Sequence, residues 1–126
     1  MNWKHVLRDL PLDACIVEHQ PFTTRYQRAN SKLEYLLEHA EVLGARDSER
    51  PISSCAEIAV WAPEPTKRRP GYYACFRIYL EDSHPVFAVL YCFYDGRDQS
   101  PGFRSVEAAT SFAVAQGFRH EDQDHR

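Results

Sequence analysis

The sequence lacks the short motifs that usually assign a chain to a functional class. No CxxC pair, GxGxxG or GxxxxGK[ST] loop, HExxH or GxSxG occurs in the 126 residues. These absences remove the common signatures of zinc sites, nucleotide-binding loops, metalloproteases and serine hydrolases. We therefore expect no catalytic residues, no metal and no cofactor, and a protein that is not an enzyme.

Long apolar runs and a strong net charge are also missing. Nowhere do about 18 apolar residues follow one another, and the first residues, MNWKHVLRDLPLD, alternate charged with apolar side chains, unlike a secretory signal. The 15 Lys and Arg residues against 18 Asp and Glu residues give a net charge of -3, which supplies no global field to attract DNA or an anionic membrane. The sequence predicts a soluble, cytoplasmic protein without membrane contact.

What is present is enough for one folded domain. Hydrophobic residues make up 44% of the chain and charged residues 26%, far from the composition of disordered segments. A length of 126 residues suits a single domain. We assign residues 1–118 to this domain and the polar end, 119–126, to a flexible tail.

The pattern of apolar residues predicts seven elements in the order αβαβββα. They are a helix over 3–10, a strand over 14–17, a helix over 31–43, strands over 55–62, 72–80 and 85–94, and a helix over 106–115. This order indicates an α+β fold in which helices pack on a mainly antiparallel, four-stranded sheet.

Capping signals set the helix boundaries. Asn2 is placed to cap the first helix, and Ser31 with Glu34 forms a capping box at the start of the second. Gly44 is expected just past the end of that second helix, and the polar stretch 45–54 is expected to be a surface loop. Ser105 is placed to cap the last helix.

The short connection 81–84 predicts a hairpin between the last two strands. Pairing around it places Cys75 and Cys92 on the same face of the sheet. No feature of the sequence indicates an oxidising compartment, so we expect both thiols, like Cys15 and Cys55, to be free and buried rather than joined.

The last two strands are apolar at nearly every position, which is typical of strands covered on both faces. Because so small a domain has few helices with which to cover two faces, a homodimer through the sheet is one expected arrangement.

The clearest candidate contact surface is the proline-bounded connection WAPEPTKRRPGYY. Its cations could engage phosphates and its tyrosines could stack on a base, and arginine, tyrosine and tryptophan are also the residues that dominate protein interfaces. Three interpretations stay open, a solvated loop, a protein contact and a nucleic-acid contact. The candidate partner-binding residues are Trp61, Lys67, Arg68, Arg69, Tyr72 and Tyr73.

Acidic residues give two further candidates. Glu34, Glu38 and Glu41 are expected on one face of the second helix, either solvated or facing a basic partner. Glu57 lies in an apolar strand, where alternation favours an exposed side. An inward Glu57 would instead have a raised pKa and be a candidate acid. Pairing with Arg77 of the next strand is the structural alternative.

Together these features favour a small binding module that acts by protein–protein contact, as an adaptor, an inhibitor or an immunity-type protein. A nucleic-acid-associated regulator that uses the basic residues 67–69 is the first alternative. A small enzyme or small-molecule binder with a pocket between the sheet and a helix is the second.

Overall fold

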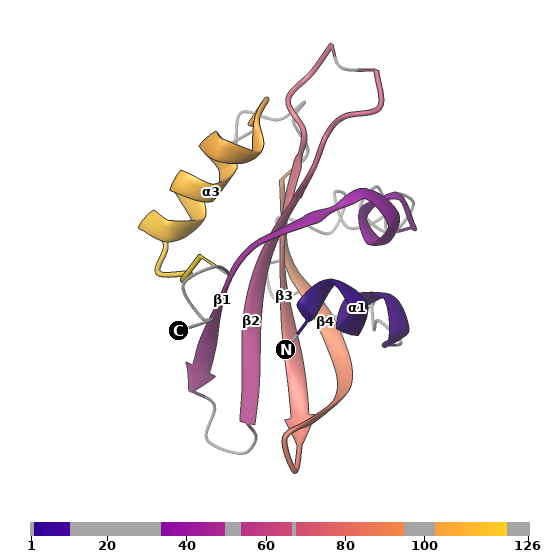
Figure 1. The fold of residues 1–126 in the computed structure, drawn as a ribbon, viewed down its shortest axis with the longest axis vertical. Helices are drawn as coiled ribbons and strands as arrows, with labels where there is room; N and C mark the ends of the chain where they lie inside the picture. Colours follow the sequence, from indigo (N-terminus) through magenta and orange to yellow (C-terminus); the bar gives the residue numbers. More distant parts are fainter. Residues whose placement is uncertain (1, 11–33, 50–53, 67, 95–102, 121–126) are drawn as a thin grey trace.

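The structure, a computed structural model, describes residues 2–10, 34–49, 54–66, 68–94 and 103–120. Its named elements are α1 (Trp3–Asp9), β1 (Glu41–Glu49), β2 (Ser54–Ala62), β3 (Tyr72–Glu81), β4 (His84–Tyr94) and α3 (Val106–Ala115). A further helical segment covers residues 34–39. The strands form one antiparallel sheet in the order β1-β2-β3-β4 (Figure 1). The predicted α+β fold with a four-stranded antiparallel sheet is confirmed.

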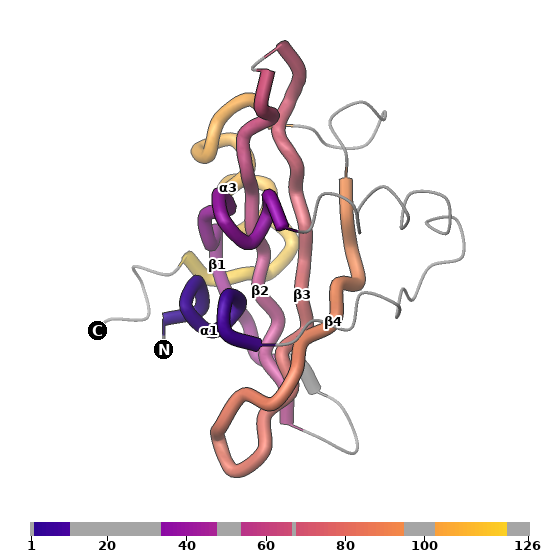
Figure 2. The backbone as a smooth tube through the Cα atoms, turned by 90° about the vertical axis from the view of Figure 1, so that its right-hand side faces the viewer, coloured from indigo at the N-terminus to yellow at the C-terminus, as the bar shows by residue number. Residues whose placement is uncertain are grey.

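Helices cover the two faces of this sheet. The segment 34–39 and α1 lie on one face, and α3 lies on the other (Figures 1 and 2). Because side chains alternate along a strand, each strand contributes to two separate apolar clusters. One cluster includes Leu7, Leu36, Ile58, Val60, Phe76, Ile78 and Leu90, and the other includes Leu43, Ala59, Trp61, Tyr73, Cys75, Ala109, Ala113 and Phe118.

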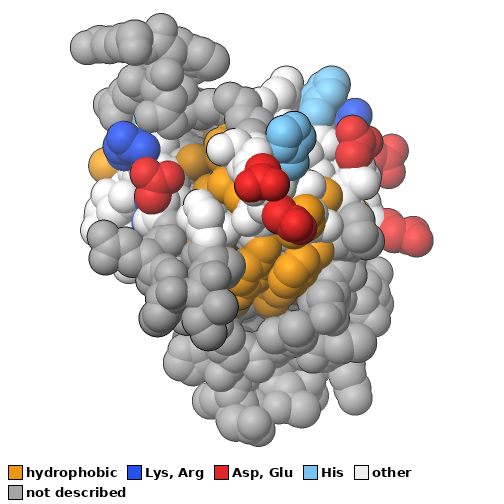
Figure 3. Space-filling model, turned by 90° about the horizontal axis from the view of Figure 1, so that it is seen from below, with side chains coloured by type: hydrophobic (Ala, Val, Ile, Leu, Met, Phe, Trp, Pro, Cys, Tyr) orange, Lys and Arg blue, Asp and Glu red, His pale blue; other side chains and the backbone are white. Residues whose placement is uncertain are grey.

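The covering of both faces explains why the central strands are apolar at almost every position. We inferred a homodimer because a second covering layer was needed, and α3 supplies that layer for the second face. The apolar pattern therefore does not require a homodimer, which remains a prediction. Val86 and Phe87 of β4 are nevertheless 39% and 38% exposed. Figure 3 shows hydrophobic side chains gathered beside acidic ones on the side of the molecule seen from below.

The hairpin between β3 and β4 forms as the sequence predicts. Glu81 pairs with His84, and the two residues between them have positive φ angles, 52° at Asp82 and 66° at Ser83. Two successive residues with positive φ angles form a two-residue hairpin turn, whose backbone twist matches that of the paired strands. In Figure 1 this hairpin forms the lower end of the molecule.

The predicted caps of α1 and α3 are also confirmed. The side chain of Asn2 accepts a hydrogen bond from the amide of His5 at 3.3 Å, and Ser105 Oγ accepts one from the amide of Ala108 at 3.2 Å. Gly117 ends α3 with a φ of 99°, a value that favours glycine. Phe118, which follows it, is buried in the second cluster.

The prediction for residues 40–49 was wrong. The helical segment ends at residue 39, and Glu41–Glu49 forms the edge strand β1 instead of a helix end and a loop. The reason is tertiary: Ala45 exchanges two backbone hydrogen bonds with Arg119, of 3.0 and 2.9 Å. A Cβ on Gly44 would lie 2.6 Å from the carbonyl oxygen of Arg119, so glycine permits this approach rather than ending a helix.

Some predictions lie outside the described residues. They are the strand over 14–17, the cap at Ser31 and most of the tail, from residue 121 onward. Arg119, which we assigned to the tail, is held against β1 by the bridge to Ala45.

Candidate functional site

The loop between β2 and β3 is folded around one carboxylate. The backbone amide of Thr66 donates to Glu64 Oε2 at 2.8 Å, and the Thr66 hydroxyl donates to the same oxygen. Glu64 itself is buried. The amide of Arg68 lies 3.4 Å from the Thr66 hydroxyl. These bonds tie Thr66 to Glu64 and Arg68 to Thr66, in the part of the loop next to Arg69.

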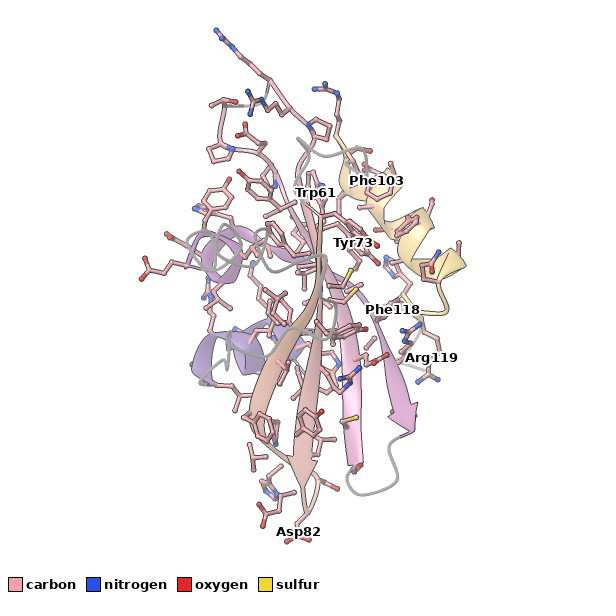
Figure 4. The ribbon with its side chains drawn as sticks, turned by 180° about the vertical axis from the view of Figure 1, so that it is seen from behind. Trp61, Tyr73, Asp82, Phe103, Phe118 and Arg119 are labelled. Atoms are coloured by element: carbon pink, nitrogen blue, oxygen red, sulfur yellow. The ribbon has the colours of Figure 1, made fainter. Side chains whose placement is uncertain are left out.

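The base of the loop is fixed to the segment that leads into α3. The carbonyl oxygen of Phe103 accepts two hydrogen bonds, from the amide of Gly71 and from the indole Nε1 of Trp61, both at 2.8 Å. A Cβ on Gly71 would lie 2.5 Å from that indole nitrogen, so only glycine fits there. Figure 4 shows Trp61 and Phe103 together at this end of the sheet.

The same tie brings together arginines that are distant in the sequence. Arg69 of the loop and Arg104 line a hollow of about 260 Å³, together with Trp61, Pro63, Glu64 and Gly71. Arg104 Nη1 lies 3.4 Å from the carbonyl oxygen of Arg68. All three arginines are exposed. We call Arg68, Arg69 and Arg104 the arginine end; in Figure 4 long side chains tipped with nitrogen extend from the upper end of the molecule.

The structure corrects the predicted aromatic part of this surface. Trp61, Tyr72 and Tyr73 are only 8%, 3% and 1% exposed, so they do not form an open platform beside the arginines. Tyr72 and Tyr73 are successive strand residues and point to opposite faces, each of which is covered. Lys67 lies outside the described residues.

Sequence reasoning did not identify Arg104. It lies 35 positions after Arg69 in a stretch that reads as a loop, and it is held at the hollow by the hydrogen bonds to the Phe103 carbonyl and by its own contact with the Arg68 carbonyl. No local pattern signals that proximity.

The acidic candidates separate in the structure. Glu34 and Glu38 are exposed on the helical segment 34–39, whereas Glu41 is the first residue of β1 and not part of that helix. Glu34 and Glu38 line a shallow hollow with Arg8 and Leu37. The three glutamates therefore do not form the single helical face that we expected.

The acidic segment is nevertheless tied to the loop of the arginine end. Tyr35 donates its hydroxyl to the carbonyl oxygen of Pro63 at 2.7 Å, and its ring lies 4.4 Å from that of His39. A phenol is protonated at neutral pH, and burial raises the pKa of Tyr35 further, so this hydroxyl can act as the donor. Pro63 is thus held from the face of the sheet opposite α3.

Glu57 belongs to a buried ion cluster and not to an exposed face. Its carboxylate contacts Arg46 Nε at 2.7 Å and Arg77 Nη2 at 3.3 Å, across three neighbouring strands. Glu57 and Arg77 are 6% and 3% exposed. The predicted pairing of Glu57 with Arg77 is confirmed, and it gives the glutamate a structural explanation.

A second hollow lies between the sheet and α3. It has a volume of about 150 Å³ and is lined by Arg46, Tyr73, Cys75, Tyr91, Cys92, Tyr94, Phe112, Gln116 and Phe118. Figure 4 shows sulfur atoms between Tyr73 and Phe118 on this side of the sheet. Burial raises the pKa of Tyr73 and of Tyr91 far above the ordinary value of a phenol, so both hydroxyls keep their protons.

The described part of the chain contains no group of three His, Cys, Asp or Glu side chains arranged to hold a metal ion. Among the same residues, no helix has both the length and the apolar character needed to span a bilayer. Comparison of the chain with protein-family models, with curated proteins and with solved structures found no match.

Proposed function

We propose that this chain is a small binding module that contacts an acidic segment of another protein through the arginine end. The observation that carries the proposal is the convergence of Arg69 and Arg104, from separate parts of the chain, on one hollow of about 260 Å³. Guanidinium groups pair with carboxylates through two parallel hydrogen bonds, and arginine is enriched at protein interfaces.

The hydrogen bonds beneath this surface support the same function. A loop that is ordered before binding loses less conformational entropy when a partner arrives. The bonds from Thr66 to Glu64 and from Gly71 and Trp61 to Phe103 supply that order. An adaptor or an inhibitor that works in the cytoplasm would suit such a preformed surface.

Nucleic acid is the less favoured partner for two reasons. The aromatic rings that would stack on bases are buried, and the described residues of the arginine end include three arginines, fewer than the roughly six to ten phosphate contacts of a dedicated DNA binder.

Affinity capture with matched variants tests the proposal. The bait proteins are the wild type, the triple variant Arg68→Ala, Arg69→Ala, Arg104→Ala, and a control with Lys4→Ala and Arg8→Ala on α1, each with and without nuclease. We expect one protein to be recovered by the wild type and the control under both conditions and to be lost with the triple variant. The purified partner should then bind the triple variant at least about tenfold more weakly, the equivalent of 1.4 kcal/mol.

Each other outcome has a defined meaning. Equal recovery by the triple variant would contradict a contact at the arginine end. Recovery that disappears with nuclease would replace the protein partner with nucleic acid. The triple variant should unfold within about 1 kcal/mol of the wild type, because exposed charges contribute little to stability, so a loss of binding would not reflect a loss of fold.

A further inference from the structure

Cys75 and Cys92 lie directly opposite each other on neighbouring strands. Cys75 of β3 and Cys92 of β4 are register partners in the antiparallel sheet, and both are free thiols in the structure. A register shift adjoins the pair, between Cys75 and Phe76, yet the two thiols are within hydrogen-bond contact. Opposed residues in a regular antiparallel pair have Cα atoms about 4.5 to 5.5 Å apart. This separation falls within the range of about 4.4 to 6.8 Å that a disulfide spans, so the two sulfurs can be joined with little movement of the backbone.

The two thiols differ in their access to solvent. Cys75 is 4% exposed, whereas Cys92 is partly exposed. Both line the hollow of about 150 Å³ between the sheet and α3. Gln116, at the end of α3, also lines this hollow and is exposed, so the hollow opens at the surface. A small reagent that enters it can therefore reach Cys92 before Cys75.

The surroundings also shift the pKa values of the two thiols in opposite directions. The pKa of Cys92 is lowered chiefly because the S–H of Cys75 donates a hydrogen bond to its sulfur; burial opposes this shift, and a hydrogen bond from the hydroxyl of Tyr94 adds a smaller lowering. The pKa of Cys75 is raised by the same hydrogen bond and by burial. A thiolate is the reactive form of cysteine.

We propose that Cys92 and Cys75 form a thiol–disulfide exchange site for a small disulfide, with Cys92 as the attacking thiol and Cys75 as the resolving thiol. This site is separate from the arginine end and does not depend on the function proposed for it. Among the described cysteines, Cys55 is also buried but pairs in register with Ser48 and Tyr79, and so has no thiol across the sheet.

The exchange is a balanced two-step reaction. The Cys92 thiolate attacks one sulfur of the disulfide, the S–S bond breaks, and one thiolate leaves and takes a proton from solvent. Cys75 then loses its proton to solvent and attacks the Cys92 sulfur, which releases the second thiolate. The protein dithiol loses two electrons, and the small disulfide gains them as two free thiols.

Peptide mapping of the intact chain tests the site. The folded protein is incubated with oxidised glutathione, remaining thiols are blocked in acid, and the chain is cut with trypsin without reduction. Because the Arg69–Pro70 bond resists trypsin, Cys75 lies in peptide 69–77 and Cys92 in peptide 78–97. We expect these two peptides to be recovered joined, and the intact chain to lose two hydrogen atoms.

Three variants separate the roles of the thiols. Cys75→Ser should stop at a mixed disulfide that carries one glutathione on Cys92, and Cys92→Ser should leave Cys75 unmodified over the same time. The control Cys55→Ser should form the 69–77 to 78–97 link as the wild type does.

The wild-type result decides the proposal even if a serine variant fails to fold. A folded wild type in which peptides 69–77 and 78–97 are not joined after this treatment would overturn it. Modification of Cys75 in Cys92→Ser at the rate seen for Cys92 in Cys75→Ser would overturn the assignment of the attacking thiol.

Discussion

The two faces of the sheet are built from alternating residues of the same four strands, yet they have different chemistry. The face covered by α1 and the segment 34–39 is filled by side chains such as Ile58, Phe76 and Ile78, which are fully buried and apolar. The face covered by α3 also buries an ion cluster, tyrosine hydroxyls and two thiols.

The difference shows how a small domain combines stability with reactive groups. Burial of apolar surface stabilises the fold, whereas a buried charge or hydroxyl is costly unless it is paired. The first face contributes stability without chemistry. The second face contains polar groups that need defined partners, and it is there that the opposed thiols and the hollow occur.

The largest expected loss of stability comes from the face covered by α1 and the segment 34–39. Phe76→Ala should lower the free energy of unfolding by about 3 to 5 kcal/mol, because it removes a fully buried ring and leaves a cavity. Denaturant unfolding followed by circular dichroism measures the loss. Val114→Ala on α3, where the side chain is 50% exposed, is the control and should change stability by less than about 0.5 kcal/mol. A loss of under about 1 kcal/mol for Phe76→Ala would show that this face is not the main core.

A smaller loss of stability is expected when the ion cluster on the face covered by α3 is disrupted. Glu57→Gln should cost about 3 kcal/mol, because it leaves the buried guanidinium of Arg77 without its carboxylate. Replacing both residues, by Glu57→Leu with Arg77→Met, should recover a large part of this loss. If the single substitution were neutral in denaturant unfolding, Glu57 would not be the partner on which Arg77 depends.

The smallest effect concerns the thiols and leaves the fold unchanged. The rate at which iodoacetamide modifies Cys92 rises with pH as the thiolate forms. Because the pKa of Cys92 is lowered, the midpoint of that rise should lie below the midpoint of free glutathione in the same buffer. Cys75→Ser should move the midpoint, because a hydroxyl replaces the S–H that stabilises the thiolate. A midpoint at or above that of glutathione would contradict the hydrogen bond between the two sulfurs.

Much of the second face could be predicted from local sequence. The turn at Asp82 and Ser83 sets the pairing of Glu81 with His84, and alternation from it predicts Cys75 and Cys92 on one face; two register shifts, next to Leu80 and next to Cys75, then bring the two cysteines directly opposite each other. Alternation and the capping residue Ser105 predict the strands and α3. These features depend on neighbours within a few positions, which is why the pattern reveals them.

The features that the sequence did not predict depend on contacts between distant residues. The strand β1 contains Gly44 and polar residues, and its pairing with Arg119 joins segments 74 positions apart. The placement of Arg104 at the arginine end and the burial of Trp61 likewise depend on Phe103, which is 42 positions from the tryptophan. Local propensity carries no information about such partners.

The double hydrogen bond to the carbonyl oxygen of Phe103 has an evolutionary consequence. Every residue type presents the same carbonyl group, so a substitution at residue 103 can keep both bonds while its backbone stays in place, and what it loses is the packing of the Phe103 ring on Tyr73 and Phe112. The donors have no such freedom: Trp61 must keep its indole N–H, and residue 71 must remain a glycine for lack of space. In any set of descendants, Trp61 and Gly71 should therefore change last at the base of this loop.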